Sequence, residues 1–215
     1  MSTFHIVSKK SPTEGGPYFV GTGFFISPTI LVTAAHAVCE SATIVYGTQS
    51  TLKSTRVSAP RDIFTGTPGV MRLEFKVLKR IIESGPPRID IAILKVSEGI
   101  RWGQFIHIDV SVEDRNIGDR VDVLGYPRYN EDWFNRMHPQ LTNPLQGFVD
   151  AIQTLQTQKL NISTGSLLSV GEYYTYRLSS SPGMSGGPVM CGSKAIGESS
   201  AVSVNSRGSC RYSER

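Results

Sequence analysis

The sequence predicts an all-β fold, and three observations lead to this prediction. Short apolar runs separated by turn residues recur along most of the chain, as they do in β-sandwiches and β-barrels. The 215 residues include 21 glycines and 12 prolines, which is typical of a globular protein with many loops. Hydrophobic residues make up 39% of the chain, enough to bury one large β unit or two smaller ones.

The expected strands follow one another with short interruptions. Most combine β-branched or aromatic residues with flanking turn residues. A boundary between two β units is expected at residues 97–104 (SEGIRWGQ), where Gly and polar residues interrupt the pattern. Strands are predicted at residues 19–26, 30–33, 43–46, 75–77, 89–96, 105–110, 120–124, 159–162, 167–170 and 173–178.

One stretch breaks the β pattern, an insertion near residues 130–157. Asn143 and Pro144 supply a helix N-cap and first turn. We expect a helix over residues 144–157, forming either a packed surface element or the rim of a substrate groove. The apolar residues with helical spacing are Leu145, Phe148, Val149, Ile152 and Leu155.

Charge and hydropathy argue against two classes of partner. The net charge is +4, but Lys and Arg are scattered, without the clusters typical of nucleic-acid-binding surfaces. No stretch reaches the roughly 18 apolar residues of a membrane span. The first residues, MSTFHIVSKKSPTEGGP, lack the apolar core of a signal peptide. We expect neither a nucleic-acid partner nor a membrane anchor; a cytoplasmic location is favoured, although the compartment stays open.

The cysteines predict no metal centre. Cys39, Cys191 and Cys210 show neither metal-ligand nor CxxC spacing. Their odd number favours a reducing compartment, because small secreted domains usually carry several bridges. Whether Cys191 pairs with Cys210 stays open.

The stretch SSSPGMSGGPVM, residues 179–190, contains the strongest candidate for a reacting group. The hydroxyl of a nucleophilic serine needs a base, and its reaction needs backbone N–H groups aimed at the developing oxyanion. Gly183 allows a backbone in which its own N–H and that of Ser185 form such a hole, and Gly186 and Gly187 allow a tight turn. The alternative is a glycine-rich turn without chemistry.

A base and an orienting carboxylate are also present. Among the four histidines, His36 follows an apolar strand run and has small neighbours, in ILVTAAHAV. Asp90 lies at the start of the apolar run IDIAILKV, where a carboxylate is costly unless it is paired. Considered singly, His36 could be a structural histidine, and Asp90 could be a solvated residue at the end of a strand. Together, in the order His, Asp, Ser, they indicate nucleophilic catalysis.

Four stretches carry a family resemblance: GTGFFISPTILVTAAHAV, IDIAILKV, IGDRVDVLGYP and SPGMSGGPV. They resemble the trypsin-like (chymotrypsin-fold) serine endopeptidases, closest to the branch of glutamyl endopeptidases and HtrA-type proteases. This resemblance implies two packed six-stranded antiparallel β-barrels, at residues 1–104 and 105–215, with the site in the cleft between them. It also implies an endopeptidase acting through an acyl-enzyme, with His36 as base, Asp90 as orienter, Ser185 as nucleophile, and the N–H groups of Gly183 and Ser185 as the oxyanion hole.

The resemblance also indicates a substrate pocket. Ser179 lies where trypsin has the aspartate that selects Arg or Lys, and Ser199 lies where glutamyl endopeptidases carry a histidine. With Ser200 nearby, we expect a pocket that is small or uncharged. Met184 replaces the aspartate that captures a new N-terminus in activated zymogens, which argues against that mode of activation.

The expected enzyme needs no cofactor or metal, acts on protein or peptide substrates, and is a monomer. Only a short segment follows Ser185, so a truncated second barrel is one interpretation of the C-terminus. Two alternatives stay open: a non-catalytic interaction module of the same fold, and a protease unit of a larger intracellular protein.

Overall fold

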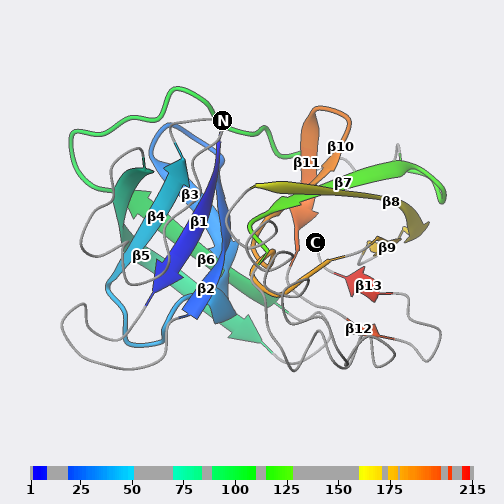
Figure 1. The fold of residues 1–215 in the computed structure, drawn as a ribbon, viewed down its shortest axis with the longest axis horizontal. Coiled ribbons are helices and arrows are strands. Elements are labelled where there is room, and N and C mark those ends of the chain that lie inside the picture. Colours follow the sequence, from blue (N-terminus) through cyan, green and yellow to red (C-terminus); the bar gives the residue numbers. More distant parts are fainter. Residues whose placement is uncertain are drawn as a thin grey trace, which may run out of the picture.

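The computed structural model describes residues 2–8, 19–50, 70–83, 89–109, 115–127, 160–170, 174–178, 180–199, 203–204 and 210–213. Within these residues the protein is built of β-strands, and its helical content is a single 3₁₀ turn. Figure 1 shows two units side by side, a barrel of the blue to blue-green strands β1 to β6 and a second sheet of the strands β7 to β13. The predicted all-β class is confirmed.

The first unit is a closed six-stranded barrel in which all neighbouring strands are antiparallel, in the order β1-β2-β3-β6-β5-β4. Aromatic rings fill its interior: Phe4, Phe25 and Phe75 are each 0% exposed, and Trp102 stacks on Phe25 with ring centroids 5.7 Å apart. Burial of these rings supplies much of the stability of the barrel. Its strands are β1 (Thr3–Ser8), β2 (Phe19–Phe25), β3 (Ile30–Ala34), β4 (Ile44–Ser50), β5 (Val70–Glu83) and β6 (Ile89–Val96).

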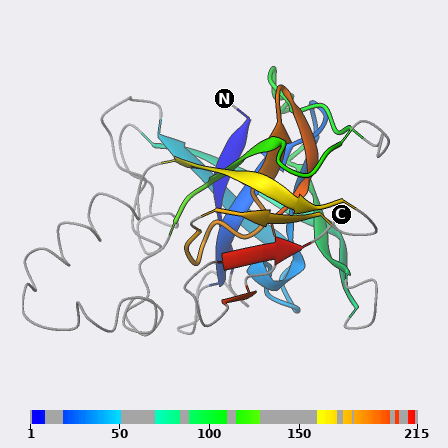
Figure 2. The same cartoon turned by 90° about the vertical axis from the view of Figure 1, so that its right-hand side faces the viewer.

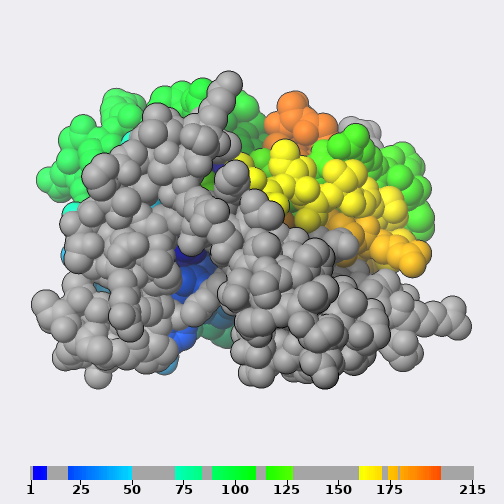
Figure 3. Space-filling view, in the orientation of Figure 1, coloured from blue at the N-terminus to red at the C-terminus, as the bar shows by residue number. Residues whose placement is uncertain are grey.

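The second unit is a seven-stranded sheet in the order β11-β10-β7-β8-β9-β13-β12. Val121, Val123, Tyr176 and Val189 form much of its core. Figure 2 shows β13 (red) alongside the strands it extends, and Figure 3 shows β8 (yellow) at the surface beside β7 (green). The strands are β7 (Arg120–Gly125), β8 (Asn161–Ser169), β9 (Thr175–Arg177), β10 (Pro188–Cys191), β11 (Lys194–Glu198), β12 (Ser203–Val204) and β13 (Cys210–Ser213).

The segment after β6 links the two units and corrects one prediction. Of the strand expected at 105–110, the described residues 105–109 form no strand, and their one ladder contact is an isolated bridge between Ile108 and Ala195. The reason is that this segment bonds to both units: Ile106 N donates to Phe25 O at 2.8 Å, while Ala195 N donates to His107 O at 2.9 Å. A segment shared in this way builds no continuous ladder with either sheet.

Other differences from the expected strands are smaller. The runs at 159–162 and 167–170 belong to one continuous strand, β8. The sequence did not predict β1, because all six of its residues are buried and the period-2 alternation of a half-exposed strand is missing. The predicted boundary at 97–104 lies between the last barrel strand and β7, and the domain division itself stays a prediction. The helical insertion near 130–157 lies outside the described residues.

Two further expectations concern the described residues. No helix among them has the length and apolar character to cross a membrane. Cys39 and Cys191 carry free thiols.

Candidate active site

His36 lies on a short turn at the end of β3. The strand stops at Ala34, and a single 3₁₀ turn, η1 (Ala35–Ala37), follows. Ala35 and Ala37 are buried, whereas the His36 side chain is 43% exposed. The small alanine side chains therefore let the turn pack against the barrel while the imidazole projects from it.

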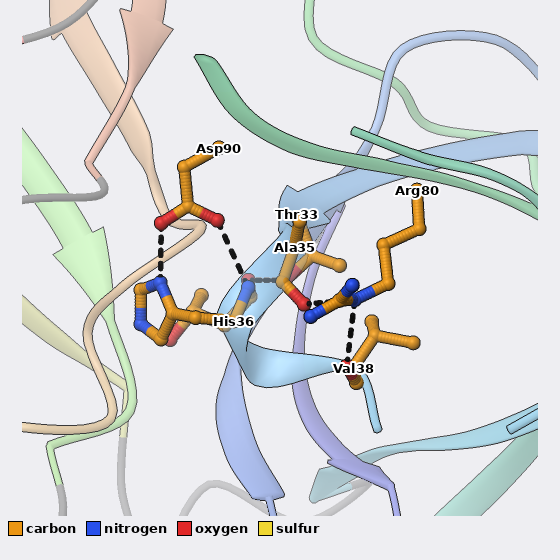
Figure 4. Close-up of polar contacts among 7 residues, drawn as sticks. Thr33, Ala35, His36, Val38, Arg80 and Asp90 are labelled. Carbon is orange, nitrogen blue, oxygen red and sulfur yellow. Dashed lines mark hydrogen bonds and ion pairs between the residues drawn. The ribbon is translucent and has the colours of Figure 1, made fainter. Parts of the chain in front are cut away.

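Asp90 holds this turn from the neighbouring strand. Ala34 pairs with Ile91 across the β3–β6 ladder, so Asp90 lies level with the start of η1. Its Oδ2 is 2.6 Å from His36 Nδ1, and its Oδ1 accepts a hydrogen bond from His36 N at 2.9 Å (Figure 4). Both oxygens of this buried carboxylate are thus engaged by the same residue, which offsets the cost of its burial.

The contact also fixes the protonation pattern of the ring. An ionised carboxylate can only accept hydrogen bonds, so His36 Nδ1 carries a hydrogen. In the neutral imidazole the other nitrogen, Nε2, is then an acceptor. His36 is therefore arranged to accept a proton at Nε2.

Ser185 lies in the tight loop that precedes β10. Gly183 and Gly186 have φ of +89° and +82°, a left-handed backbone that glycine adopts without strain. Three amides of the loop are paired, those of Met184, Gly186 and Gly187. Among the described residues, the amides of Gly183 and Ser185 have no acceptor. Within the described part of the chain, the two N–H groups that we expect to form an oxyanion hole are therefore not used by the fold of the loop.

The loop is docked on the barrel beside the His36 turn. Thr22 of β2 donates its N–H to Ser185 O at 2.7 Å and its hydroxyl to Gly183 O at 2.8 Å. A methyl group added to Gly21 would lie 2.5 Å from the Ala37 side chain and 3.0 Å from Ser185 O. Ser185 and the residue that follows His36 therefore flank the same point of β2.

The hydroxyl of Thr22 is also part of a buried polar cluster. Tyr126, just after β7, donates its N–H to the Thr22 hydroxyl at 2.9 Å, and its own hydroxyl donates to Thr3 O at 3.4 Å. Burial raises the pKa of the Tyr126 phenol far above its ordinary range, and a hydrogen bond with Gln49 opposes this in part. The phenol is therefore a neutral donor at any physiological pH.

Comparison with known proteins decides the family. The trypsin-like peptidase domain family matches residues 21–196, most of the chain, including His36, Asp90 and Ser185. The chain belongs to this family. A search of curated proteins found no significant match.

Solved structures of proteases share the fold of this trypsin-like peptidase domain. The active form of the Rv3671c protease from M. tuberculosis is 18% identical, with a TM-score of 0.56 over 98% of this chain and 74% of that one. The inactive form of the same protease is also 18% identical, with a TM-score of 0.55 over 98% of this chain and 82% of that one. The MamO protease domain from Magnetospirillum magneticum is 15% identical, with a TM-score of 0.53 over 99% of this chain and 89% of that one.

The expected pocket residues are only partly placed. Ser199 is buried, its N–H donates to Gly187 O at 2.9 Å, and its Oγ has no partner among the described residues. Ser179 and Ser200 lie outside the described residues. The structure thus places one of the three beside the Ser185 loop.

Two residues beside the candidate site were not expected from the sequence. They are Thr22 and Arg80, whose Nε donates to the carbonyls of Ala35 and Val38 in the turn that carries His36. The sequence does contain one indication for Thr22, because a hydroxyl inside the apolar run GTGFFI needs a hydrogen-bond partner once it is buried. It contains no indication for Arg80, because an arginine near the end of a strand is usually a solvated side chain. No group of three metal-ligating side chains occurs in the described part of the chain.

Proposed function

We propose that this peptidase domain is a serine endopeptidase with Ser185 as nucleophile, His36 as general base and then acid, and Asp90 as orienting group. The observation that carries the proposal is the docking of the Ser185 loop on β2 beside the His36–Asp90 pair. The amides of Gly183 and Ser185, which have no acceptor among the described residues, support it, since acyl transfer needs N–H donors for the developing oxyanion.

The proposed reaction has two halves with balanced proton transfers. Ser185 Oγ attacks the peptide carbonyl carbon while His36 Nε2 takes its proton, and Gly183 and Ser185 amides stabilise the oxyanion. The C–N bond then breaks, and Nε2 returns the proton to the departing amine. Water attacks the resulting ester through the same steps, which releases the acid and regenerates Ser185.

The substrates we propose are proteins or peptides with a small or uncharged side chain before the cleaved bond. This specificity rests on Ser179, Ser199 and Ser200, whose short hydroxylated side chains offer neither a charge nor a long groove. Cleavage of a peptide library tests it: preference for small or uncharged residues supports the proposal, and preference for Arg, Lys or Glu contradicts it.

We expect a fluorophosphonate probe to label the wild-type protein at Ser185. Peptide mapping by mass spectrometry would locate the adduct, and Ser185→Ala should abolish both labelling and proteolysis. The expected loss of kcat in Ser185→Ala is about 10⁴-fold or more. Ser193→Ala, an exposed serine in the turn between β10 and β11, is the control and should keep full activity.

Two outcomes would contradict this proposal. A folded wild-type protein that neither reacts with the probe nor cleaves any library peptide would favour the non-catalytic interaction module. Labelling at another serine would remove Ser185 from the mechanism.

Thr22 provides a second test, of the loop that presents the two amides. We expect Thr22→Val to lower kcat about 10- to 100-fold, because the Gly183 carbonyl loses the donor that orients it. Leaving Tyr126 N without its acceptor should also cost about 1–3 kcal/mol of unfolding free energy, measured by urea denaturation. Thr22→Ser keeps the hydroxyl and should stay within a few-fold of wild type; equal losses in both variants would refute this role of the hydroxyl.

A further inference from the structure

Arg80, on β5, makes a contact with the His36 turn that the proposed chemistry does not use. Its Nε donates to Ala35 O at 3.0 Å and to Val38 O at 3.1 Å (Figure 4). These carbonyls belong to the first residue of η1 and to the residue just after it. Arg80 therefore spans the whole turn that carries His36.

The turn depends on such outside support. A helix of this length satisfies few of its own backbone groups, and within η1 the internal bond is Val38 N to Ala35 O at 3.0 Å. Its N-cap residue, Ala34, supplies no side-chain hydrogen bond. A charged donor on the carbonyls of the turn is stronger than a neutral one, so Arg80 is well suited to hold them.

A β-bulge directs Arg80 rather than Lys79 toward the turn. The register of β5 on β6 shifts between Val77 and Lys79, so that Arg80 faces Ala92. Directly opposed residues of an antiparallel pair share one face of the sheet, and Ala92 is 0% exposed. Without the extra residue, Lys79 would lie opposite Ala92 and Arg80 would point to the other face.

The same strand pair also holds Asp90. In the shifted register Ile82 lies opposite Asp90, two positions from the Arg80–Ala92 pair. Asp90 accepts the N–H of His36, while Arg80 donates to the carbonyls on the far side of the turn. Figure 4 shows the imidazole and the guanidinium on opposite sides of η1. The turn is thus clamped between an anion on β6 and a cation on β5.

We propose that Arg80 is a positioning residue for His36, acting through the backbone of η1. This inference rests on the proposed function, because it assigns a role to the turn only if His36 is the base. Arg80 bonds to the backbone and not to the imidazole, so its loss should displace the ring without removing it. Displacing a catalytic group by about 1 Å can cost about 10²-fold in rate.

The test compares Arg80→Met with Lys79→Met. Both remove one positive charge from adjacent positions of β5, but Lys79 is exposed and lies on the other face. We expect Arg80→Met to lower kcat about 10- to 100-fold with KM within about twofold, and Lys79→Met to match the wild type. Arg80→Lys keeps a cationic donor one bond further along the side chain, so its kcat should lie between those of wild type and Arg80→Met.

Proton NMR can detect the displacement of the His36 ring without any measurement of catalytic turnover. The hydrogen between His36 Nδ1 and Asp90 should give a downfield resonance, which Arg80→Met should shift or broaden and Lys79→Met should leave unchanged. Far-UV circular dichroism checks that each variant folds. If Arg80→Met does not fold, Arg80→Lys decides, with an intermediate kcat and a shifted resonance as the expected result.

Unchanged kcat and an unchanged resonance in folded Arg80→Met would overturn the inference, as would equal losses in Arg80→Met and Lys79→Met. If Arg80→Met does not fold, a wild-type kcat and resonance in Arg80→Lys would overturn it as well. Failure of the proposed function would look different. The wild type would then show neither labelling nor turnover, while the resonance would still report whether Arg80 holds His36.

Discussion

Replacing Asp90 with Asn should lower kcat about 10⁴-fold while the fold is kept. Asp90 accepts two hydrogen bonds from His36, one from the backbone N–H and one from Nδ1. Asn has one acceptor oxygen and one amino group in the same positions. The backbone N–H can only donate, so the amide oxygen should face it and the amino group should face Nδ1.

This arrangement would reverse the tautomer of His36. With an amino group donating to it, Nδ1 must become the acceptor, and the hydrogen moves to Nε2. In the proposed mechanism Nε2 takes the proton of Ser185, and with a hydrogen already on it this nitrogen has no lone pair for that step, so the Ser185 hydroxyl would not be activated. The loss therefore arises from the wrong tautomer, and the fold should survive because the replacement is isosteric.

The measurement is kcat on a cleaved library peptide, with thermal unfolding to confirm the fold. Asp109→Asn is the matched control, since Asp109 is a poorly exposed carboxylate that pairs with Arg115 at 2.5 Å in the linker between the units. We expect its kcat to stay within a few-fold of wild type. An Asp90→Asn variant that keeps a tenth or more of the wild-type kcat would refute the orienting role of Asp90.

The residues to which we assign the chemistry could be predicted from the sequence because each breaks a local rule. An Asp inside IDIAILKV is a buried charge in need of a partner, and a Ser among glycines in GMSGGP is a hydroxyl on a tight turn. The predicted pair His36–Asp90 is in direct contact in the structure, although 54 positions separate the two residues. Long-range pairing of this kind follows from the order of the strands, which the family resemblance supplied.

The contacts of Arg80 and Thr22 could not be predicted from the sequence, and Arg80 illustrates the reason. Which face of β5 it occupies depends on a bulge, and the extra residue that shifts the register has no signature in VMRLEFKVLKRIIE. Thr22 is similar, since its two acceptors lie 161 and 163 positions further along the chain. A side chain that is specified by register and by distant backbone carbonyls can be assigned only once the strands are in place.

Gly186→Ala should abolish activity and strongly destabilise the protein, because two separate costs coincide at this residue. Its φ of +82° already disfavours an L side chain by about 1–2 kcal/mol. Its methyl group would also lie 2.5 Å from Ala34 N and still closer to Thr22 O and Thr33 Oγ1. Those two oxygens are hydrogen-bonded to each other at 2.6 Å, so neither can move away at low cost.

The alternative to unfolding is that the loop lifts from the barrel, which would separate Ser185 from His36. We therefore expect kcat to fall about 10³-fold or more and the unfolding free energy to fall by about 3–5 kcal/mol, measured by peptide cleavage and urea denaturation.

Gly192→Ala is the control that separates the cost of a positive φ from the cost of steric overlap at Gly186. Gly192 has a φ of +64°, but an added methyl group would meet nothing within 4 Å. This control should lose only about 1–2 kcal/mol of unfolding free energy and keep the wild-type kcat. If Gly186→Ala behaved like Gly192→Ala, backbone strain alone would explain both, and close docking of the Ser185 loop on β2 and β3 would not be needed for catalysis. A much larger loss at Gly186 would instead show that this close approach positions the nucleophile.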